Sequence, residues 1–211
     1  MVCYCSRRRI LFIHIPKTGG LTVEKILCDF YGFKKFTFRN GSYDFLNDPA
    51  GKRGIFKYIL SHSEEAKKYD LKNFYKFAFV RNPLTRAVSA INYLSDRSHK
   101  NDGRFPRDYQ TFVRRSRADV YFYMHFNLNQ VDCLKDDNNE INFQFIGHFE
   151  NLMNDLNKVL IDILGLRKFD FDSIHVNKSS HKMLFSEENL REDTLRIHEK
   201  DFIFIENLNS V

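Results

Sequence analysis

Tryptophan is absent from this chain of 211 residues, and proline is scarce, with only four residues. No apolar run reaches the length of about 18 residues that a membrane-spanning helix needs. Only four cysteines are present, and no second cysteine pair or histidine cluster lies at metal-ligand spacing from Cys3 and Cys5. These absences argue against a membrane span and a disulfide-rich scaffold, and we expect no metal site.

The composition is that of an ordinary globular protein. Hydrophobic residues make up 43% of the chain and charged residues 28%, which suits one well-filled core. There are no internal repeats or Pro/Ser-rich linkers, so we expect a single domain over residues 1–211. The N-terminal stretch MVCYCSRRRILFIHI does not resemble a signal peptide, and free thiols suit a reducing compartment, so we expect a cytoplasmic protein.

Positive charge is concentrated in one part of the chain, whose formal net charge is +6. Residues 97–117, here called the basic segment, hold two acidic residues and seven basic ones: Arg97, Lys100, Arg104, Arg107, Arg114, Arg115 and Arg117. Such a segment favours an anionic partner, such as nucleic acid, an acidic membrane surface or an acidic polysaccharide. A solvated face without a partner would have the same composition.

Three stretches predict a strand that is followed directly by a helix. Residues 9–15 form an apolar run typical of a buried strand, and apolar side chains then recur at helical spacing. The same order is seen at residues 75–94 and 142–165. The apolar run at residues 55–60 predicts a further strand, and a last helix should begin near Ser186. This alternation predicts an α/β fold with a central parallel sheet flanked by helices.

The stretch HIPKTGGLTV (residues 14–23) joins the first predicted strand to the first predicted helix. Free backbone N–H groups point outward from a helix start, where the helix dipole adds partial positive charge. Gly19 and Gly20 allow the backbone to close around an anion, and Lys17 adds a full positive charge. A tight surface turn needs no lysine, so the stretch favours a phosphate-binding loop. It is not a Walker A loop, because that motif places its lysine after the glycines.

A second polar motif follows the strand predicted near residue 75. In FVRNPLTRAVSAINY, Arg81 lies at the strand end, and Arg86 and Ser89 lie on the following helix. Arginine offers a planar fork of donors that matches a phosphate, and serine can complete the site. The alternative is an arginine that caps the strand and a serine that packs within the helix. Two phosphate-type sites at two strand ends suggest a ligand with two separated phosphate groups.

The two motifs, in this order, resemble the signatures of sulfotransferases that use 3′-phosphoadenosine 5′-phosphosulfate. They are most similar to the carbohydrate branch that includes the heparan-sulfate 2-O and chondroitin enzymes. The segments HFNLNQVDCL, FIGHFENLMNDL and HVNKSS follow in the family's order, so the resemblance covers about residues 9–207. It implies a P-loop-like three-layer fold with a central parallel sheet. The chain departs from the family at Leu21, where a small hydroxyl residue is usual, although the backbone N–H of Leu21 can still donate.

The resemblance also implies roles for individual residues. Lys17 would contact the 5′-phosphosulfate and stabilise charge on the leaving side. Backbone and hydroxyl donors to the 5′-phosphate would come from Thr18, Gly19, Gly20, Leu21 and Thr22. Arg81 and Ser89 would bind the 3′-phosphate, and Lys178 would lie at the rim of the donor site. No metal is expected, because the sulfuryl group carries less charge than a phosphoryl group.

A histidine is the natural base near neutral pH for taking a proton from an acceptor hydroxyl. His62 follows the apolar run at residues 55–60, which would place it at a strand end that faces the same cleft. The resembling family also places a histidine between its two phosphate motifs, so we predict that His62 is the base, with Glu64 as the second choice. His125 would reach the acceptor side, and His14 would form a hydrogen bond that fixes the shape of the loop.

The acceptor is expected to be a carbohydrate or another hydroxyl-bearing compound, and the basic segment favours an anionic one such as a uronate-bearing glycan. Within the basic segment it would be bound by Arg104, Arg107, Arg114 and Arg115. Two alternatives remain at this stage. One is a nucleotide kinase, which should place a lysine after the glycines and carboxylates for Mg²⁺, and the other is a non-catalytic binder of nucleotide or acidic polymer. No nucleic-acid partner is expected, because no known nucleic-acid-binding motif is present.

Overall fold

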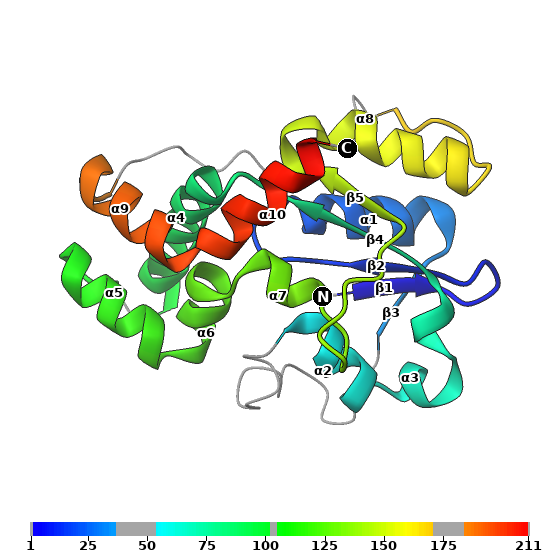
Figure 1. The fold of residues 1–211 in the computed structure, drawn as a ribbon, viewed down its shortest axis with the longest axis horizontal. Coiled ribbons are helices and arrows are strands. Elements are labelled where there is room, and N and C mark those ends of the chain that lie inside the picture. The colour runs from blue at the N-terminus through cyan, green and yellow to red at the C-terminus, as the bar shows by residue number, and fades with distance from the viewer. Residues whose placement is uncertain (1, 37–53, 102–104, 171–183, 211) are drawn as a thin grey trace.

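The computed structural model describes residues 2–36, 54–101, 105–170 and 184–210, and Arg104 and Lys178 lie outside these ranges. The described strands form one sheet in the order β3-β1-β2-β4-β5. Their bounds are β1 (Val2–Cys5), β2 (Ile10–Ile13), β3 (Lys34–Lys35), β4 (Tyr75–Val80) and β5 (Phe145–His148). Helices flank this sheet (Figure 1), so the predicted α/β fold is confirmed.

The sheet is mixed, whereas the sequence predicted a parallel one. β2, β4 and β5 are parallel neighbours, as the strand–helix units predicted. β1, which was not predicted, pairs antiparallel with β2 and with β3. The chain reverses between β1 and β2 in a turn in which the Arg9 N–H donates to the Ser6 carbonyl. A short turn can join only antiparallel strands, and this explains the added edge.

The α-helices are α1 (Gly20–Tyr31), α2 (Ile55–His62), α3 (Glu64–Lys68), α4 (Pro83–Asn101), α5 (Tyr109–Ala118), α6 (Val120–Phe122), α7 (Gln130–Leu134), α8 (Leu152–Lys158), α9 (Glu187–Ile197) and α10 (Glu199–Asn209). Short 3₁₀ segments are η3 (Leu71–Asn73) and η5 (Phe149–Asn151), and π-helical segments are η4 (Tyr123–Asn127) and η6 (Val159–Ile163). The helix expected near Ser186 is confirmed as α9, and the Ser186 hydroxyl accepts a hydrogen bond from the N–H of Asn189.

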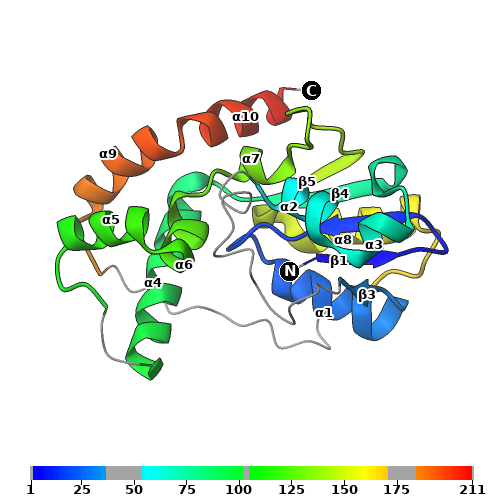
Figure 2. The same ribbon diagram turned by 90° about the horizontal axis from the view of Figure 1, so that it is seen from below.

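Apolar side chains divide the fold into two cores on opposite faces of the sheet and a third among helices. Phe12, Phe77 and Phe79 pack against α1, α8 and η6 on one face. Leu11 and Ala78 belong to the core of the other face, which contains side chains from α2, η4 and α7. The third core joins α4, α5, α6 and α9, which gather at one end of the sheet in both views (Figures 1 and 2).

Residues 55–60 form helix α2, so the prediction of a strand there was wrong. Ile55, Phe56, Tyr58 and Ile59 are all buried, and they recur at the spacing of one helical face. A short apolar run is compatible with either a strand or a buried helix, and the helical spacing decides the structure here. The argument that placed His62 at a strand end is therefore wrong as well, because His62 is the last residue of α2.

Candidate functional site

The loop between β2 and α1, residues 14–19, leads into a helix start that no side chain caps. Gly19 precedes α1 with a φ of 80°. The N–H groups of Thr22 and Val23 both donate to the Gly19 carbonyl, at 3.0 and 3.3 Å, so the N–H groups of Gly20 and Leu21 precede the first of these bonds. Lys17 also has a positive φ of 70°, which is unusual for a residue with a side chain. The earliest amides of α1 are therefore left for an acceptor from outside the helix.

A buried histidine closes this loop against α1. Nδ1 of His14 lies 3.1 Å from Oε1 of Glu24, and both side chains are buried. A Cβ added to Gly20 would lie 2.0 Å from the His14 ring, so only glycine allows this approach. The hydrogen bond expected of His14 is therefore present, and it joins the loop to α1. Burial lowers the pKa of His14, against the raising effect of the hydrogen bond to Glu24.

The hydroxyl residues of the motif differ in their surroundings. Thr18 is buried, and its hydroxyl donates to the Ile15 carbonyl at 2.9 Å. Any contact of Thr18 with a ligand would therefore come from its backbone N–H. Leu21 is 55% exposed at the start of α1, while the N–H of Thr22 already donates to the Gly19 carbonyl at 3.0 Å.

The second motif meets the first at the carboxyl ends of β2 and β4. Arg81 follows β4, and its NH1 donates to the Lys17 carbonyl at 3.3 Å. Its Nε donates to Oγ1 of Thr85 at 3.0 Å, and its guanidinium carbon lies 4.0 Å from the ring centroid of Phe149. Two motifs far apart in the sequence are thus joined at one edge of the sheet, where α/β proteins bind ligands.

Arg86 and Ser89 lie on α4 next to this edge, and both are buried. Nε of Arg86 donates to the Pro16 carbonyl at 3.1 Å, and NH2 donates to the Leu128 carbonyl at 2.9 Å. Arg86 therefore ties the β2–α1 loop to the segment after η4. Ser89 lies one turn further along α4, on the side of the helix that carries Arg86.

Lys17 lies near two arginines, and the carboxylate of Asp96 acts against them. Burial lowers the pKa of Lys17 to about 8, and the nearby charges of Arg81 and Arg86 act in the same direction. Nζ of Lys17 lies 4.2 Å from the centroid of the Tyr93 ring. None of the ion pairs among the residues that the structure describes involves Lys17, Arg81 or Arg86. An anionic ligand is what this charge distribution favours.

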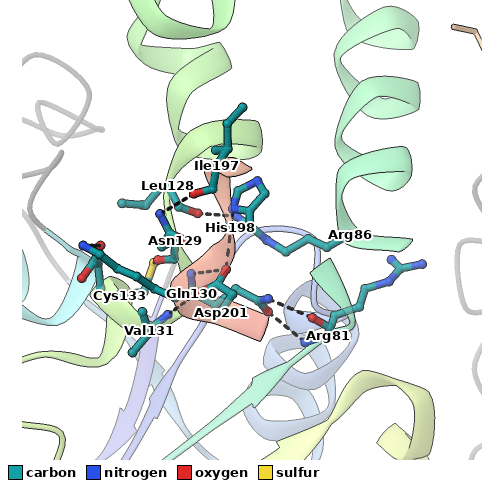
Figure 3. Close-up of polar contacts among 12 residues, drawn as sticks. Arg81, Arg86, Leu128, Asn129, Gln130, Val131, Cys133, Ile197, His198 and Asp201 are labelled. Atoms are coloured by element: carbon teal, nitrogen blue, oxygen red, sulfur yellow. Dashed lines mark hydrogen bonds and ion pairs between the residues drawn. The ribbon is translucent and has the colours of Figure 1, made fainter. Parts of the chain in front are cut away.

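A buried polar network bonds the backbone of Arg81 (Figure 3). Gln130 bonds the backbone of Arg81 twice, accepting from its N–H and donating to its carbonyl, each at 2.8 Å. The Asp201 carboxylate of α10 accepts from the N–H groups of Gln130 and Val131 at 2.9 and 3.0 Å. Burial raises the pKa of Asp201, while Arg86 and these two amides oppose the shift.

Sequence reasoning missed Gln130 and Asp201. Gln130 lies in HFNLNQVDCL, a segment that carries the family resemblance, and Asp201 lies in residues 198–205, HEKDFIFI. The resemblance was the available signal for Gln130, but neither segment shows which backbone groups the two side chains reach.

The structure separates the two histidines that were considered for the acceptor side. The ring of His125, in η4, stacks on Tyr93, the residue that Lys17 also contacts, at 4.9 Å between centroids. His62 is exposed, and its ring stacks on Tyr58 of its own helix at 4.4 Å. Burial lowers the pKa of His125 to about 4, and Lys17 and Arg86 add to the shift. His125 is therefore neutral at pH 7 but a weak proton acceptor.

The arginines of the basic segment do not all lie on one surface. Arg114 and Arg117 line a shallow groove of about 460 Å³ along α5. Arg115 instead lies 3.6 Å from a carboxylate oxygen of Asp119, and its guanidinium carbon lies 4.3 Å from the ring centroid of Phe122. Of the four predicted acceptor-binding arginines, Arg114 thus lines the groove, Arg115 packs on protein, and Arg107 is exposed ahead of α5. Arg117 was not among those four.

This chain has an uncapped helix start and two neighbouring cationic side chains at the carboxyl ends of parallel strands. These are the features of an anion-binding α/β protein. Residues 2–204 match the profile of the sulfotransferase family, and the chain belongs to that family. Its general activity is therefore the transfer of a sulfuryl group to a hydroxyl-bearing acceptor. Comparison with curated proteins and with solved structures gives no significant match.

Two further searches cover the described ranges of the chain. Within them, no helix is both long and apolar enough to cross a membrane. No group of three or more His, Cys, Asp or Glu side chains in these ranges could hold a metal ion.

Proposed function

We propose that this sulfotransferase moves the sulfuryl group of 3′-phosphoadenosine 5′-phosphosulfate to a carbohydrate hydroxyl and releases 3′-phosphoadenosine 5′-phosphate. The observation that carries the proposal is the hydrogen bond between Arg81 and the Lys17 carbonyl, which brings two strand-end motifs together. A ligand there meets Lys17 and the start of α1 on one side and the Arg81 guanidinium on the other. Two cationic motifs at one edge of the sheet suit a nucleotide that carries two phosphate groups.

The residues present fit such a donor chemically. Lys17 and Arg81 supply positive charge that no carboxylate pairs among the described residues. Gly19 adopts a positive φ and Gly20 leaves room for the His14 ring, so the two glycines allow the loop shape that presents the first amides of α1. The proposed contacts to the 5′-phosphosulfate are Lys17, Thr18, Gly19, Gly20, Leu21 and Thr22. Those to the 3′-phosphate are Arg81 and Ser89, and Lys178 is proposed at the rim.

When bound, the donor supplies the sulfuryl group and a phosphate leaving group. Lys17 would stabilise the negative charge that develops on the leaving side, in a partly buried site where such stabilisation is strong. The first amides of α1 would hold the phosphate in one position, so that an acceptor hydroxyl can approach in line. A base would take the proton from that hydroxyl.

We propose His62 as this base, because a pKa of about 4 makes His125 a poor proton acceptor near pH 7. His62→Ala should lower kcat by about 100-fold or more, with an unchanged Kd for 3′-phosphoadenosine 5′-phosphate. The matched control is His125→Phe, which keeps a ring against Tyr93 but has no proton acceptor and should lose far less. If His125→Phe lost turnover and His62→Ala did not, the role of base would belong to His125 instead.

We further propose that the groove on α5 and the exposed Arg107 bind the anionic part of the acceptor, with Arg104 and Arg115 as further contacts and His125 on the acceptor side. The double variant Arg114→Glu/Arg117→Glu should raise the acceptor KM by about tenfold and flatten its dependence on salt. The double variant Arg167→Glu/Lys168→Glu makes the same change in net charge on exposed residues outside the groove and should leave KM unchanged. Equal effects in both variants would mean that only net charge matters.

The decisive experiment is an assay with radiolabelled sulfate donor and a panel of glycans, phenols and peptides, beside a parallel assay with labelled ATP and Mg²⁺. Labelled glycan supports the proposal, and labelled product from ATP would support a kinase. Thermal stabilisation by 3′-phosphoadenosine 5′-phosphate without any labelled product would indicate a non-catalytic binder. The proposal would be overturned if 3′-phosphoadenosine 5′-phosphate gave no thermal stabilisation and no labelled product formed.

A further inference from the structure

The ammonium group of Lys17 lies on the face of an aromatic ring. Its Nζ is 4.2 Å from the ring centroid of Tyr93, which is within the range of a cation–π contact. Tyr93 lies on α4 one turn after Ser89, so the helix that carries the second motif also carries this ring. The contact therefore connects Lys17 of the first motif with the helix of the second.

The Tyr93 ring is itself fixed by groups from α6 and η4 and by Arg97 of its own helix. Its hydroxyl lies 2.6 Å from the hydroxyl of Tyr121, and NH1 of Arg97 donates to it at 3.3 Å. The imidazole of His125 stacks against the ring with an interplanar angle of 29°. Nδ1 of His125 in turn lies 2.8 Å from the Tyr121 carbonyl, so this nitrogen carries the hydrogen. The ring therefore has little freedom to turn away from Lys17.

We propose that Tyr93 is a positioning residue for sulfuryl transfer, whose ring holds the charged ammonium group of Lys17 at the β2–α1 loop. This inference rests on the proposed function, because it takes Lys17 as the group that meets the donor. The physical reason is the positive surroundings of Lys17, which together with burial oppose its charged form. The negative face of an aromatic ring favours the charged form and offsets part of this effect.

A chemical titration without any donor tests the contact. The rate at which acetic anhydride modifies Lys17 at different pH values, followed by mass spectrometry, reports the pKa of Lys17 directly. In the wild type and in Tyr93→Phe, which keeps the ring, it should be about 8. In Tyr93→Leu we expect a value lower by about 1. The other groups that face Lys17, namely His14, Arg81, Arg86, Asp96 and His125, are unchanged in these variants.

Kinetics then test whether the contact serves the reaction. Tyr93→Leu should lower kcat by about tenfold with an unchanged acceptor KM, whereas Tyr93→Phe should keep the wild-type kcat. In a Lys17→Met background, Tyr93→Leu should have no further effect, because the two residues act through one contact. Thermal unfolding checks that each variant is folded, and Tyr93→Met replaces Tyr93→Leu if the latter is not.

The outcomes separate this inference from the proposed function. The role of Tyr93 would be overturned if the pH dependence of Lys17 modification were the same in all three proteins, or if the losses in the double variant were additive. Neither result would affect the proposal of sulfuryl transfer. A wild type that neither transfers a sulfuryl group nor binds 3′-phosphoadenosine 5′-phosphate would overturn the proposed function. In that case the modification curves would still show whether Tyr93 controls the charge of Lys17. The positioning role of Tyr93 in sulfuryl transfer would be overturned together with the reaction.

Discussion

At the scale of single residues, Lys17 combines several unfavourable features. It has a positive φ, it is partly buried, and its neighbours Arg81 and Arg86 carry the same charge. Strain and like charge gathered at one residue are typical of functional sites rather than of surface turns. The cationic neighbours weaken the charged form in the free protein, and a bound anion would restore it.

The pH dependence of donor binding follows from this position. Lys17 must be protonated to bind an anion, and its pKa of about 8 in the folded protein lies below its ordinary value. Affinity is therefore complete below about pH 7 and falls as the pH rises through 8. The Kd for 3′-phosphoadenosine 5′-phosphate should be about tenfold higher at pH 9 than at pH 7, as measured by calorimetry.

Two variants give the controls for this titration. Lys17→Arg keeps its charge throughout this range, so its Kd should no longer rise between pH 7 and pH 9. Lys17→Met should bind weakly at every pH, with an equally flat profile. If Lys17→Met still showed the wild-type rise in Kd, a group other than Lys17 would control donor binding.

At the scale of elements, the shape of the β2–α1 loop depends on a close contact between the strand end and the helix. His14 comes from the end of β2 and Glu24 from the second turn of α1, and their hydrogen bond spans the loop. Gly20 lies beneath the His14 ring, where there is no space for a side chain. The sequence predicted the strand, the loop and the helix correctly. The sequence also predicted a hydrogen bond from His14. It could not predict that Glu24 is the partner, because that depends on how the strand and the helix lie relative to each other.

Gly20→Ala should therefore destabilise the protein. The new Cβ would lie 2.0 Å from the His14 ring, so the ring must move and its hydrogen bond to Glu24 is strained. Overpacking of this kind costs about 1–3 kcal/mol in the free energy of unfolding, measured by urea denaturation. Leu21→Ala, at the exposed neighbouring position, should change it by less than about 0.5 kcal/mol. His14→Ala combined with Gly20→Ala should make the second substitution nearly neutral, and a full additive cost would show that the clash is not the cause.

At the scale of the whole molecule, the parts that the sequence predicted are those set by short-range patterns. The α/β fold and the meeting of Lys17 with Arg81 followed from strand–helix units, because parallel strands bring their carboxyl ends to one edge. The antiparallel β1 and the helical α2 were missed, since short apolar runs do not define their own partners. Gln130 and Asp201 are bonded across 71 residues of sequence, a distance over which no local pattern gives information.

The C-terminal helix α10 should accordingly support the donor site from a distance. Asp201→Ala removes the carboxylate that accepts from two amides of α7 and leaves Arg86 buried without its nearby negative charge. Such a loss costs about 3 kcal/mol or more in the free energy of unfolding, measured by urea denaturation. Because Gln130 holds the backbone of Arg81, the Kd for 3′-phosphoadenosine 5′-phosphate should rise as well. Glu199→Ala, which removes an exposed carboxylate from the same helix, should change neither quantity. A destabilised Asp201→Ala variant with wild-type donor affinity would show that α10 stabilises the fold without positioning Arg81.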